Sequence, residues 1–239
     1  MSLRRSLTIH KHYGFRSRFL SMLFMGIKHL NHLVPGFFIN RRSVILRGNS
    51  FAGIHHKTQL KLDHSQIIIE NGTLKAGIDY GYYDGGMFDP ARDVCRIHLI
   101  NSTLRIRGDV SLYPGVCIFA QNAEIIIGNG TKINGTTQII AQEKIEIGEH
   151  CNVAQGVIIR DNDGHRISTD GSLPALTCLP VIIGNHCWLG QRSMVLKGVT
   201  IHDNVVVAAG AVVTKDIDRD TLVAGVPAKP LPGRVTWED

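Results

Sequence analysis

The residues most able to do chemistry lie in the segment Arg160-Asp161-Asn162-Asp163-Gly164-His165, where a histidine follows two aspartates. Imidazole titrates near neutral pH, so His165 could remove the proton of a hydroxyl as that hydroxyl attacks an electrophile. Asp161 or Asp163 could fix the imidazole tautomer and stabilise the imidazolium, and a backbone carbonyl could do the same. The plainer alternative is that His165, one of twelve histidines, is only exposed on the surface.

A six-residue sequence repeat flanks this segment on both sides, and the structure formed by the repeat must position it. Branched aliphatic residues occupy every first position of the hexads Ile183, Leu189, Val195, Ile201, Val207 and Val213. Shorter runs with the same spacing occur upstream, at Ile106, Leu112 and Ile118, at Ile127, Ile133 and Ile139, and at Ile147, Val153 and Ile159. A period of six fits neither an α-helix nor a simple alternating strand. It predicts a short strand and a turn, repeated three times in each triangular coil.

The coils predict an all-β solenoid in which each coil is buried only against its neighbours. A low aromatic content of 6% and 25 glycines suit such a regular structure. Two or three extra residues separate the upstream runs, which predicts small bulges at corners. The rhythm stops after Ile159 and resumes near Val181, so residues 160–180 should leave the solenoid as a loop, an interruption long enough to suggest function.

The stretch from Ile106 to Pro230 resembles the hexapeptide-repeat acyltransferase superfamily, of the sugar and polysaccharide O-acetyltransferase type. Three motifs carry the resemblance: Asp-x-Asp-Gly-His at 161–165, Gly-Asn-His-Cys-Trp-Leu-Gly at 184–190, and the C-terminal pattern from Ala208 to Lys229. The resemblance implies a left-handed parallel β-helix, a homotrimer, and acetyl-CoA as acyl donor without a metal. The handedness comes from the resemblance alone.

The same resemblance implies roles for individual residues. His165 matches the catalytic histidine, carried on a loop that leans onto a neighbouring subunit. Trp188 precedes an inward position and should point outward, as a wall for the acceptor sugar or the acetyl group, or else as packing across a subunit contact. The backbone N–H near Gln191 matches a donor that polarises the thioester carbonyl. Leu189 and Gln191 depart mildly from the family's usual isoleucine and small residue.

The C-terminal motif implies the donor site. Ala209 and Thr214 would offer main-chain contacts to the pantetheine arm, and Lys215 and Lys229 would face the coenzyme phosphates. The alternative for both lysines is simple solvation.

Charge divides the chain unevenly. Residues 1–62 contain eleven Lys or Arg and no Asp or Glu, whereas the rest has a net charge of −5. This basic segment could contact a membrane surface or an anionic glycan, or be a solvated arm. We expect three parts: residues 1–42, a basic extension with an amphipathic helix that caps the solenoid or lies on a membrane; residues 43–230, the catalytic β-helix; and residues 231–239, a tail.

The setting follows from what the sequence does not contain. The longest apolar run, Phe19 to Ile27, is too short to span a bilayer, and the N-terminus does not read as a signal peptide. Five cysteines without a Cys-x-x-Cys pair predict neither a disulfide framework nor a zinc clip. We expect a cytoplasmic protein, with the inner face of the membrane as an alternative, and no nucleic-acid partner.

These observations predict an enzyme that moves an acetyl group from acetyl-CoA to a hydroxyl of a saccharide, such as a capsule, lipopolysaccharide or related surface glycan. N-acetylation of an amino sugar nucleotide and O-acetylation of an antibiotic are alternatives within acyl transfer. A γ-type carbonic anhydrase is an alternative of another class, since His150 and His186 lie thirty-six residues apart. Gln191 stands where that enzyme class has its third histidine, and a zinc site needs three protein ligands. A non-catalytic scaffold is a further alternative.

Overall fold

The structure is a computed structural model that describes residues 43–55, 57–77, 93–166, 168, 171 and 177–238. In this part of the chain the regular elements are strands, and every third strand pairs in parallel to form three sheets. The described residues contain no helix with the length and apolar character needed to cross a membrane. The predicted extension 1–42 and its helix lie outside the described residues.

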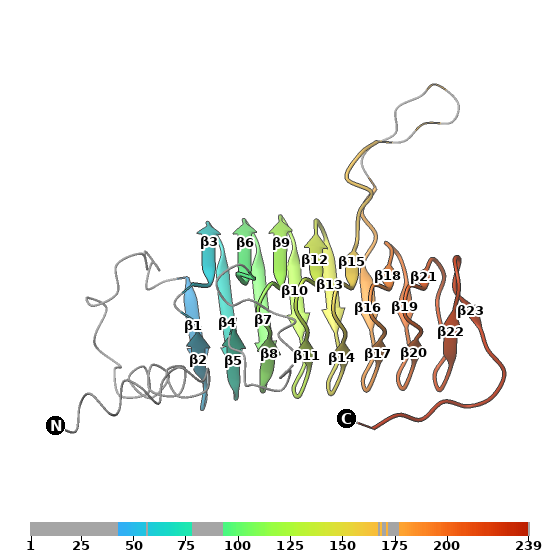
Figure 1. The fold of residues 1–239 in the computed structure, drawn as a ribbon. Helices are drawn as coiled ribbons and strands as arrows, with labels where there is room; N and C mark the ends of the chain where they lie inside the picture. Colours follow the sequence, from blue (N-terminus) through green and yellow to red (C-terminus); the bar gives the residue numbers. More distant parts are fainter. Residues whose placement is uncertain are drawn as a thin grey trace.

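The strands belong to the three sheets in turn, and Figure 1 shows them stacked along one axis. Sheet A contains β1 (Val44–Arg47), β4 (Gln66–Glu70), β7 (Thr103–Arg107), β10 (Glu124–Ile127), β13 (Lys144–Ile147), β16 (Val181–Ile183) and β19 (Thr200–Ile201). Sheet B contains β2 (Phe51–Ile54), β5 (Thr73–Ala76), β8 (Val110–Leu112), β11 (Lys132–Ile133), β14 (Asn152–Val153), β17 (Trp188–Leu189), β20 (Val206–Val207), β22 (Leu222–Ala224) and the antiparallel β23 (Lys229–Pro230). Sheet C contains β3 (Gln59–Asp63), β6 (Arg96–Ile100), β9 (Cys117–Gln121), β12 (Gln138–Ala141), β15 (Ile158–Arg160), β18 (Met194–Val195) and β21 (Val212–Val213).

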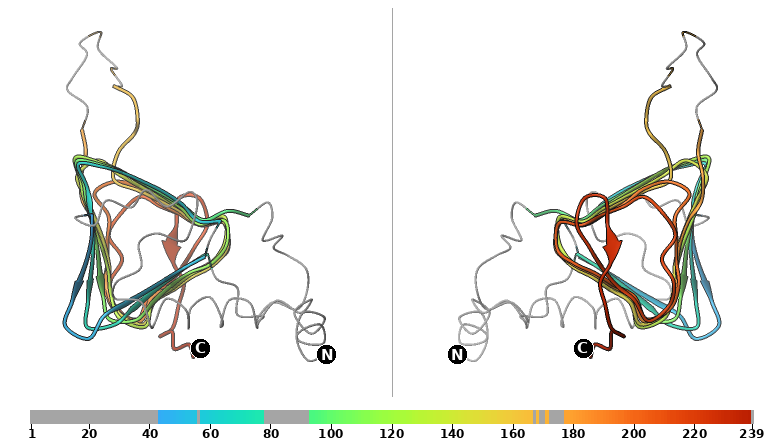
Figure 2. Two further views of the ribbon diagram at one scale, coloured as in Figure 1. Left: turned by 90° about the vertical axis from the view of Figure 1, so that its left-hand side faces the viewer. Right: turned by 90° about the vertical axis from the view of Figure 1, so that its right-hand side faces the viewer.

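Seen along its axis, the solenoid is a triangle with one sheet on each side (Figure 2). The chain passes from sheet A to B to C, and it turns counter-clockwise as it recedes from the N-terminal end. The fold is therefore a left-handed parallel β-helix, and the predicted fold class is confirmed. We name the edges of the triangle corner AB, corner BC and corner CA after the sheets that meet there.

The core is the column of first-position side chains predicted from the hexads. In sheet A, Ile106, Ile127, Ile147, Ile183 and Ile201 follow one another in register, and each is at most 1% exposed. Burying one such side chain contributes about 1.5–3 kcal/mol. Because each residue is covered by the coils above and below it, a polar group placed in the column has no partner within reach.

The upstream coils differ from expectation at corner CA. The extra residues lengthen strands: β9 and β10 have five and four residues, whereas β18 and β19 have two each. The strands pair with the adjacent coils without an offset, for example Cys117 with Gln138 and Ala120 with Ala141. The predicted corner bulges are therefore not found between residues 93 and 160. The continuous ladder satisfies the backbone of the added residues, so the coil widens instead.

The loop 160–180 leaves the solenoid at corner CA, between β15 and β16, and its described base rises away from the body (Figures 1 and 2). An isolated antiparallel bridge joins Asn162 to Cys178, and the N–H of Leu179 donates to the carbonyl oxygen of Asp161 at 2.9 Å. The two ends of the loop are thus fastened together where they leave the sheets.

Candidate active site

The base of the loop is held by the carboxylate of Asp161, which is fully buried. Its oxygens accept backbone N–H groups from the turn between β12 and β13: Gln142 at 2.8 and 3.0 Å, Glu143 at 2.7 Å and Lys144 at 2.9 Å. The side-chain amide of Asn162 donates to the same carboxylate at 2.9 Å. Asp161 therefore binds a backbone turn, and both of its oxygens are occupied there.

A lysine from the next coil ties the two sides of the loop together. Lys197 follows β18 at corner CA; its ammonium forms an ion pair with the carboxylate of Asp163 and lies 3.5 Å from the carbonyl oxygen of Thr177. His165 lies two residues beyond Asp163 and is exposed. The sequence pointed to Asp163 and His165 but gave no signal for Lys197, because only the fold brings its coil under the loop.

A second group of predicted residues lies on sheet B and corner BC. Trp188 in β17 is 41% exposed, so it points outward as its position in the hexad predicts. At corner BC the side-chain amide of Gln191 donates to that of Gln155 at 3.3 Å, and Ala209 is exposed one coil further on. A side chain at Gly190 would have its Cβ 2.6 Å from the backbone nitrogen of Ala209, so glycine keeps these two coils close together.

The remaining predicted donor-site residues lie at corner CA and at the C-terminal end. Thr214 and Lys215 follow β21 and are exposed at the same corner as the loop. Lys229 is exposed in β23. The structure thus sorts the predicted residues into two groups: one with His165 at corner CA, one with Trp188 along sheet B and corner BC. Trp188 lies on sheet B, the side of the triangle opposite corner CA, so a single chain does not bring it to the same surface as His165.

The cysteines near these groups are poor nucleophiles. At the loop base, burial raises the pKa of the Cys178 thiol, and the negative charges of Asp161 and Glu143 raise it further. Cys151 and Cys187 are 2% and 0% exposed inside the solenoid, and the hydrogen bond with Cys151 together with burial raises the pKa of Cys187. The same hydrogen bond lowers the pKa of Cys151, but that thiol is buried inside the solenoid and out of reach of an acyl donor. Because the thiolate is the reactive form, the raised pKa values of Cys178 and Cys187 leave both thiols poorly suited to carry an acyl group.

The histidines that suggested a carbonic anhydrase stand at one corner without a third ligand. His150 and His186 occupy equivalent positions at corner AB, with φ values of 53° and 52°. Gln191 stands at corner BC, across the width of sheet B, and its amide bonds Gln155. Among the described residues, no three His, Cys, Asp or Glu side chains are grouped to hold a metal ion.

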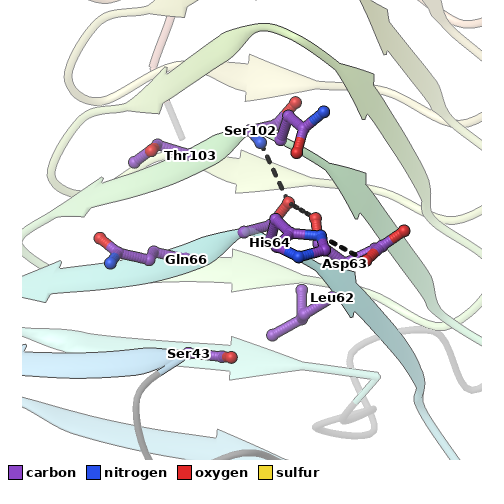
Figure 3. Close-up of a pocket in the computed structure, with 9 residues that line it drawn as sticks. Ser43, Leu62, Asp63, His64, Gln66, Ser102 and Thr103 are labelled. Carbon is purple, nitrogen blue, oxygen red and sulfur yellow. Dashed lines mark hydrogen bonds and ion pairs between the residues drawn. The ribbon is translucent and has the colours of Figure 1, made fainter.

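A polar pocket of about 590 Å³ opens at the N-terminal end of corner CA (Figure 3). The Ser65 hydroxyl donates to the carbonyl of Asp63 at 2.6 Å and accepts the N–H of Ser102 at 3.0 Å. An imidazole nitrogen of His64 lies 2.8 Å from the Asp63 carboxylate, and both side chains are more than half exposed. The Ser65 hydroxyl thus forms hydrogen bonds with backbone groups of the corner. The pocket contains none of the predicted site residues.

Comparisons with known proteins agree with the repeat. A family model described as the hexapeptide repeat of succinyl-transferase matches residues 180–215. Galactoside O-acetyltransferase of Escherichia coli (strain K12) is 32% identical over 150 residues, which cover 62% of this chain and 72% of that protein. The chain belongs to the hexapeptide-repeat acetyltransferase family. The predicted family is therefore confirmed.

Two further members of the family illustrate its range. Polysialic acid O-acetyltransferase of Escherichia coli O1:K1 / APEC is 26% identical over 140 residues, 58% of this chain but only 43% of that protein. A solved structure of a galactoside acetyltransferase in complex with coenzyme A is 28% identical to this chain and has a TM-score of 0.42. The match covers 50% of this chain and 59% of that chain.

Proposed function

We propose that this protein transfers an acetyl group from acetyl-CoA to a hydroxyl group of a saccharide. The observation that carries the proposal is the family membership: the galactoside enzyme that establishes it is an O-acetyltransferase acting on a sugar. The loop with His165, anchored at its base by Asp161, supports the same activity. Acetyl-CoA is the donor, as the coenzyme A complex of the galactoside acetyltransferase suggests.

His165 would act as general base in a single displacement. Its imidazole takes the hydroxyl proton while the oxygen attacks the thioester carbon, and the N–H near Gln191 stabilises the developing oxyanion. The C–S bond then breaks, and the imidazolium returns the proton to the departing thiolate, which leaves as coenzyme A. Asp163 is the better candidate to orient the imidazole, since it is exposed two residues from His165 while the Asp161 carboxylate is engaged by the turn.

The donor would lie against the C-terminal coils. Ala209 and Thr214 are exposed there and can offer main-chain groups to the pantetheine arm. Lys215 and Lys229 are exposed and can neutralise the coenzyme phosphates.

The separation of the two residue groups supports a homotrimer with sites between subunits. If the loop corner of one subunit faces sheet B of the next, His165 of one copy can meet Trp188 of another. Sedimentation should give three times the chain mass. Co-refolding equal amounts of inactive His165→Ala and impaired Trp188→Ala chains should restore up to about one quarter of the wild-type sites, because one interface in each mixed trimer is intact. A monomer, or a mixture no more active than its components, would contradict a shared site.

The direct test of the activity is coenzyme A release from acetyl-CoA in the presence of candidate acceptors. A panel of galactosides, sialic acid oligomers, amino sugar nucleotides and chloramphenicol separates the alternatives. We expect release that depends on a saccharide hydroxyl and a product carrying one acetyl ester. A product stable to mild base, formed only from an amino sugar nucleotide, would establish N-acetylation instead.

The proposed cellular location follows from the acetyl donor. The basic segment 1–62 would provide an additional contact outside the active site. The enzyme would work in the cytoplasm, where acetyl-CoA is available. The basic segment would contact an anionic membrane or glycan, with its affinity falling as salt rises. In the described part of the segment, Arg47 already pairs with Glu70 at 3.1 Å, so not all of its charge is free for a partner.

A further inference from the structure

The C-terminal tail, residues 231–238, turns back along the outside of the solenoid after β23 (Figure 1). Its anchors lie at corner AB on successively earlier coils. The guanidinium of Arg234 pairs with the carboxylate of Asp220 at 2.8 Å. The side-chain amide of Asn204, one coil earlier, donates to the carbonyl oxygen of Val235 at 3.1 Å. The tail therefore follows a defined path towards the coil that carries Trp188.

The tail ends in an aromatic cluster beside that residue. The ring of Trp237 stacks on the imidazole of His186, with centroids 4.4 Å apart and an interplanar angle of 10°. Its indole N–H donates to the carbonyl oxygen of His186 at 3.0 Å. The ring of Trp188 lies 6.1 Å away at an angle of 43°. The two tryptophans of the chain thus lie side by side on the outer surface.

A chain of polar contacts along corner AB prepares the surface on which the tail lies. An imidazole nitrogen of His186 lies 3.1 Å from the amide oxygen of Asn204, whose amide nitrogen donates to Asp220 at 2.8 Å. The Asn204 amide and the Arg234 guanidinium hold the pKa of Asp220 below its usual value, so the ion pair persists to lower pH than that of an ordinary aspartate. The cluster therefore has a fixed geometry rather than a loose hydrophobic contact.

We propose that Trp237 is a positioning residue for the acceptor side of the acetyl-transfer site. It holds the ring of Trp188 in one orientation and covers one of its sides, so that a sugar ring meets a wall already in place. This assignment rests on the proposed function and on the prediction that Trp188 is a wall for the acceptor sugar. Without the tail, the acceptor itself must order the Trp188 side chain, and that entropic cost corresponds to roughly a 3- to 10-fold weaker acceptor binding.

The test is steady-state kinetics of the full-length chain with acetyl-CoA and a galactoside that the wild type accepts. Trp237→Ala should raise the acceptor KM roughly 3- to 10-fold, while kcat and the KM for acetyl-CoA change little. Trp237→Phe should retain most of the acceptor affinity because a ring still stacks on His186. Glu238→Gln, one residue away at an exposed position, is the matched control and should behave as wild type.

Circular dichroism of the strong far-UV indole transition gives a readout that does not depend on activity. A pair of indoles 6.1 Å apart should give a coupled signal that Trp237→Phe and Trp188→Phe each abolish while the melting temperature stays within a few degrees. An active wild type whose Trp237→Ala variant keeps its acceptor KM would overturn this assignment alone. A fall in kcat with unchanged KM values for both substrates, together with a lowered melting temperature, would show a merely structural tail and would also overturn it. A wild type that acetylates no saccharide would overturn the proposed function, and this assignment with it.

Discussion

Replacing Asp161 by alanine should unfasten the base of the loop and lower the stability of the whole solenoid. Three backbone N–H groups, those of residues 142–144, would lose their acceptor, and the Asn162 amide would lose its contact as well. A hydrogen bond to a charged group contributes about 1.5–3 kcal/mol. The turn is partly exposed, so water can replace some of these bonds.

We therefore expect a total loss of about 3 kcal/mol in the free energy of unfolding. For a domain of this size that corresponds to a fall of roughly 6–12 °C in the melting temperature. Asp161→Asn should lose less, because one oxygen remains to accept N–H groups of the turn. Asp163→Ala is the matched control: its ion pair with Lys197 is partly exposed, so its removal should cost less than about 1 kcal/mol.

The assay is thermal unfolding followed by circular dichroism, with turnover measured well below the transition. Asp161→Ala should melt early, whereas Asp163→Ala should melt like wild type and lose kcat if Asp163 orients the imidazole. Wild-type melting of Asp161→Ala would refute the structural role of the buried carboxylate. A lower melting temperature for Asp163→Ala alone would reverse the two assignments.

Three further predictions test the core, the donor site and the thiols. Val195→Asp places an unpaired charge in the buried column and should lower the free energy of unfolding by at least about 3 kcal/mol. Met194→Asp, on the outer face of the same strand, is the control and should change the free energy of unfolding by less than about 1 kcal/mol. A similar cost for both variants in denaturant titrations would contradict the register. Lys215→Ala should raise the KM for acetyl-CoA more than it lowers kcat, and an unchanged KM would exclude Lys215 from the phosphate site. In the native protein Cys117 should react with a thiol reagent at neutral pH long before Cys95, because burial raises the pKa of Cys95 to about 12; equal labelling by mass spectrometry would show that the coils open.

The fold could be predicted because its information is periodic and local. Each inward residue is branched and aliphatic, and its six-residue spacing determines both the strand and the corner, so the register from Ile183 to Val213 followed from the sequence. The outward direction of Trp188 followed from the same pattern. The widened upstream coils did not, because a few added residues fit a corner bulge or longer strands equally well until the neighbouring coil is known.

The candidate site was predicted only in part, because its supporting contacts join residues far apart in the chain. The buried Asp161 carboxylate reads in the sequence like a partner for His165, and only the neighbouring turn shows what it binds. Lys197 contacts Asp163 from a later coil, and Trp237 lies beside Trp188 from the tail. No motif marks them, since an ion pair and a ring stack depend on how coils and tail are placed beside each other.

The most direct test of the proposed mechanism is the turnover of His165→Ala on an acceptor that the wild type acetylates. Removing a general base should lower kcat about 10²- to 10⁴-fold. The dissociation constant for acetyl-CoA, measured by calorimetry on the same preparation, should stay nearly unchanged because the coenzyme contacts lie on the C-terminal coils. Full turnover by His165→Ala, or an acetylated cysteine trapped on a competent pathway, would contradict direct transfer with His165 as the base.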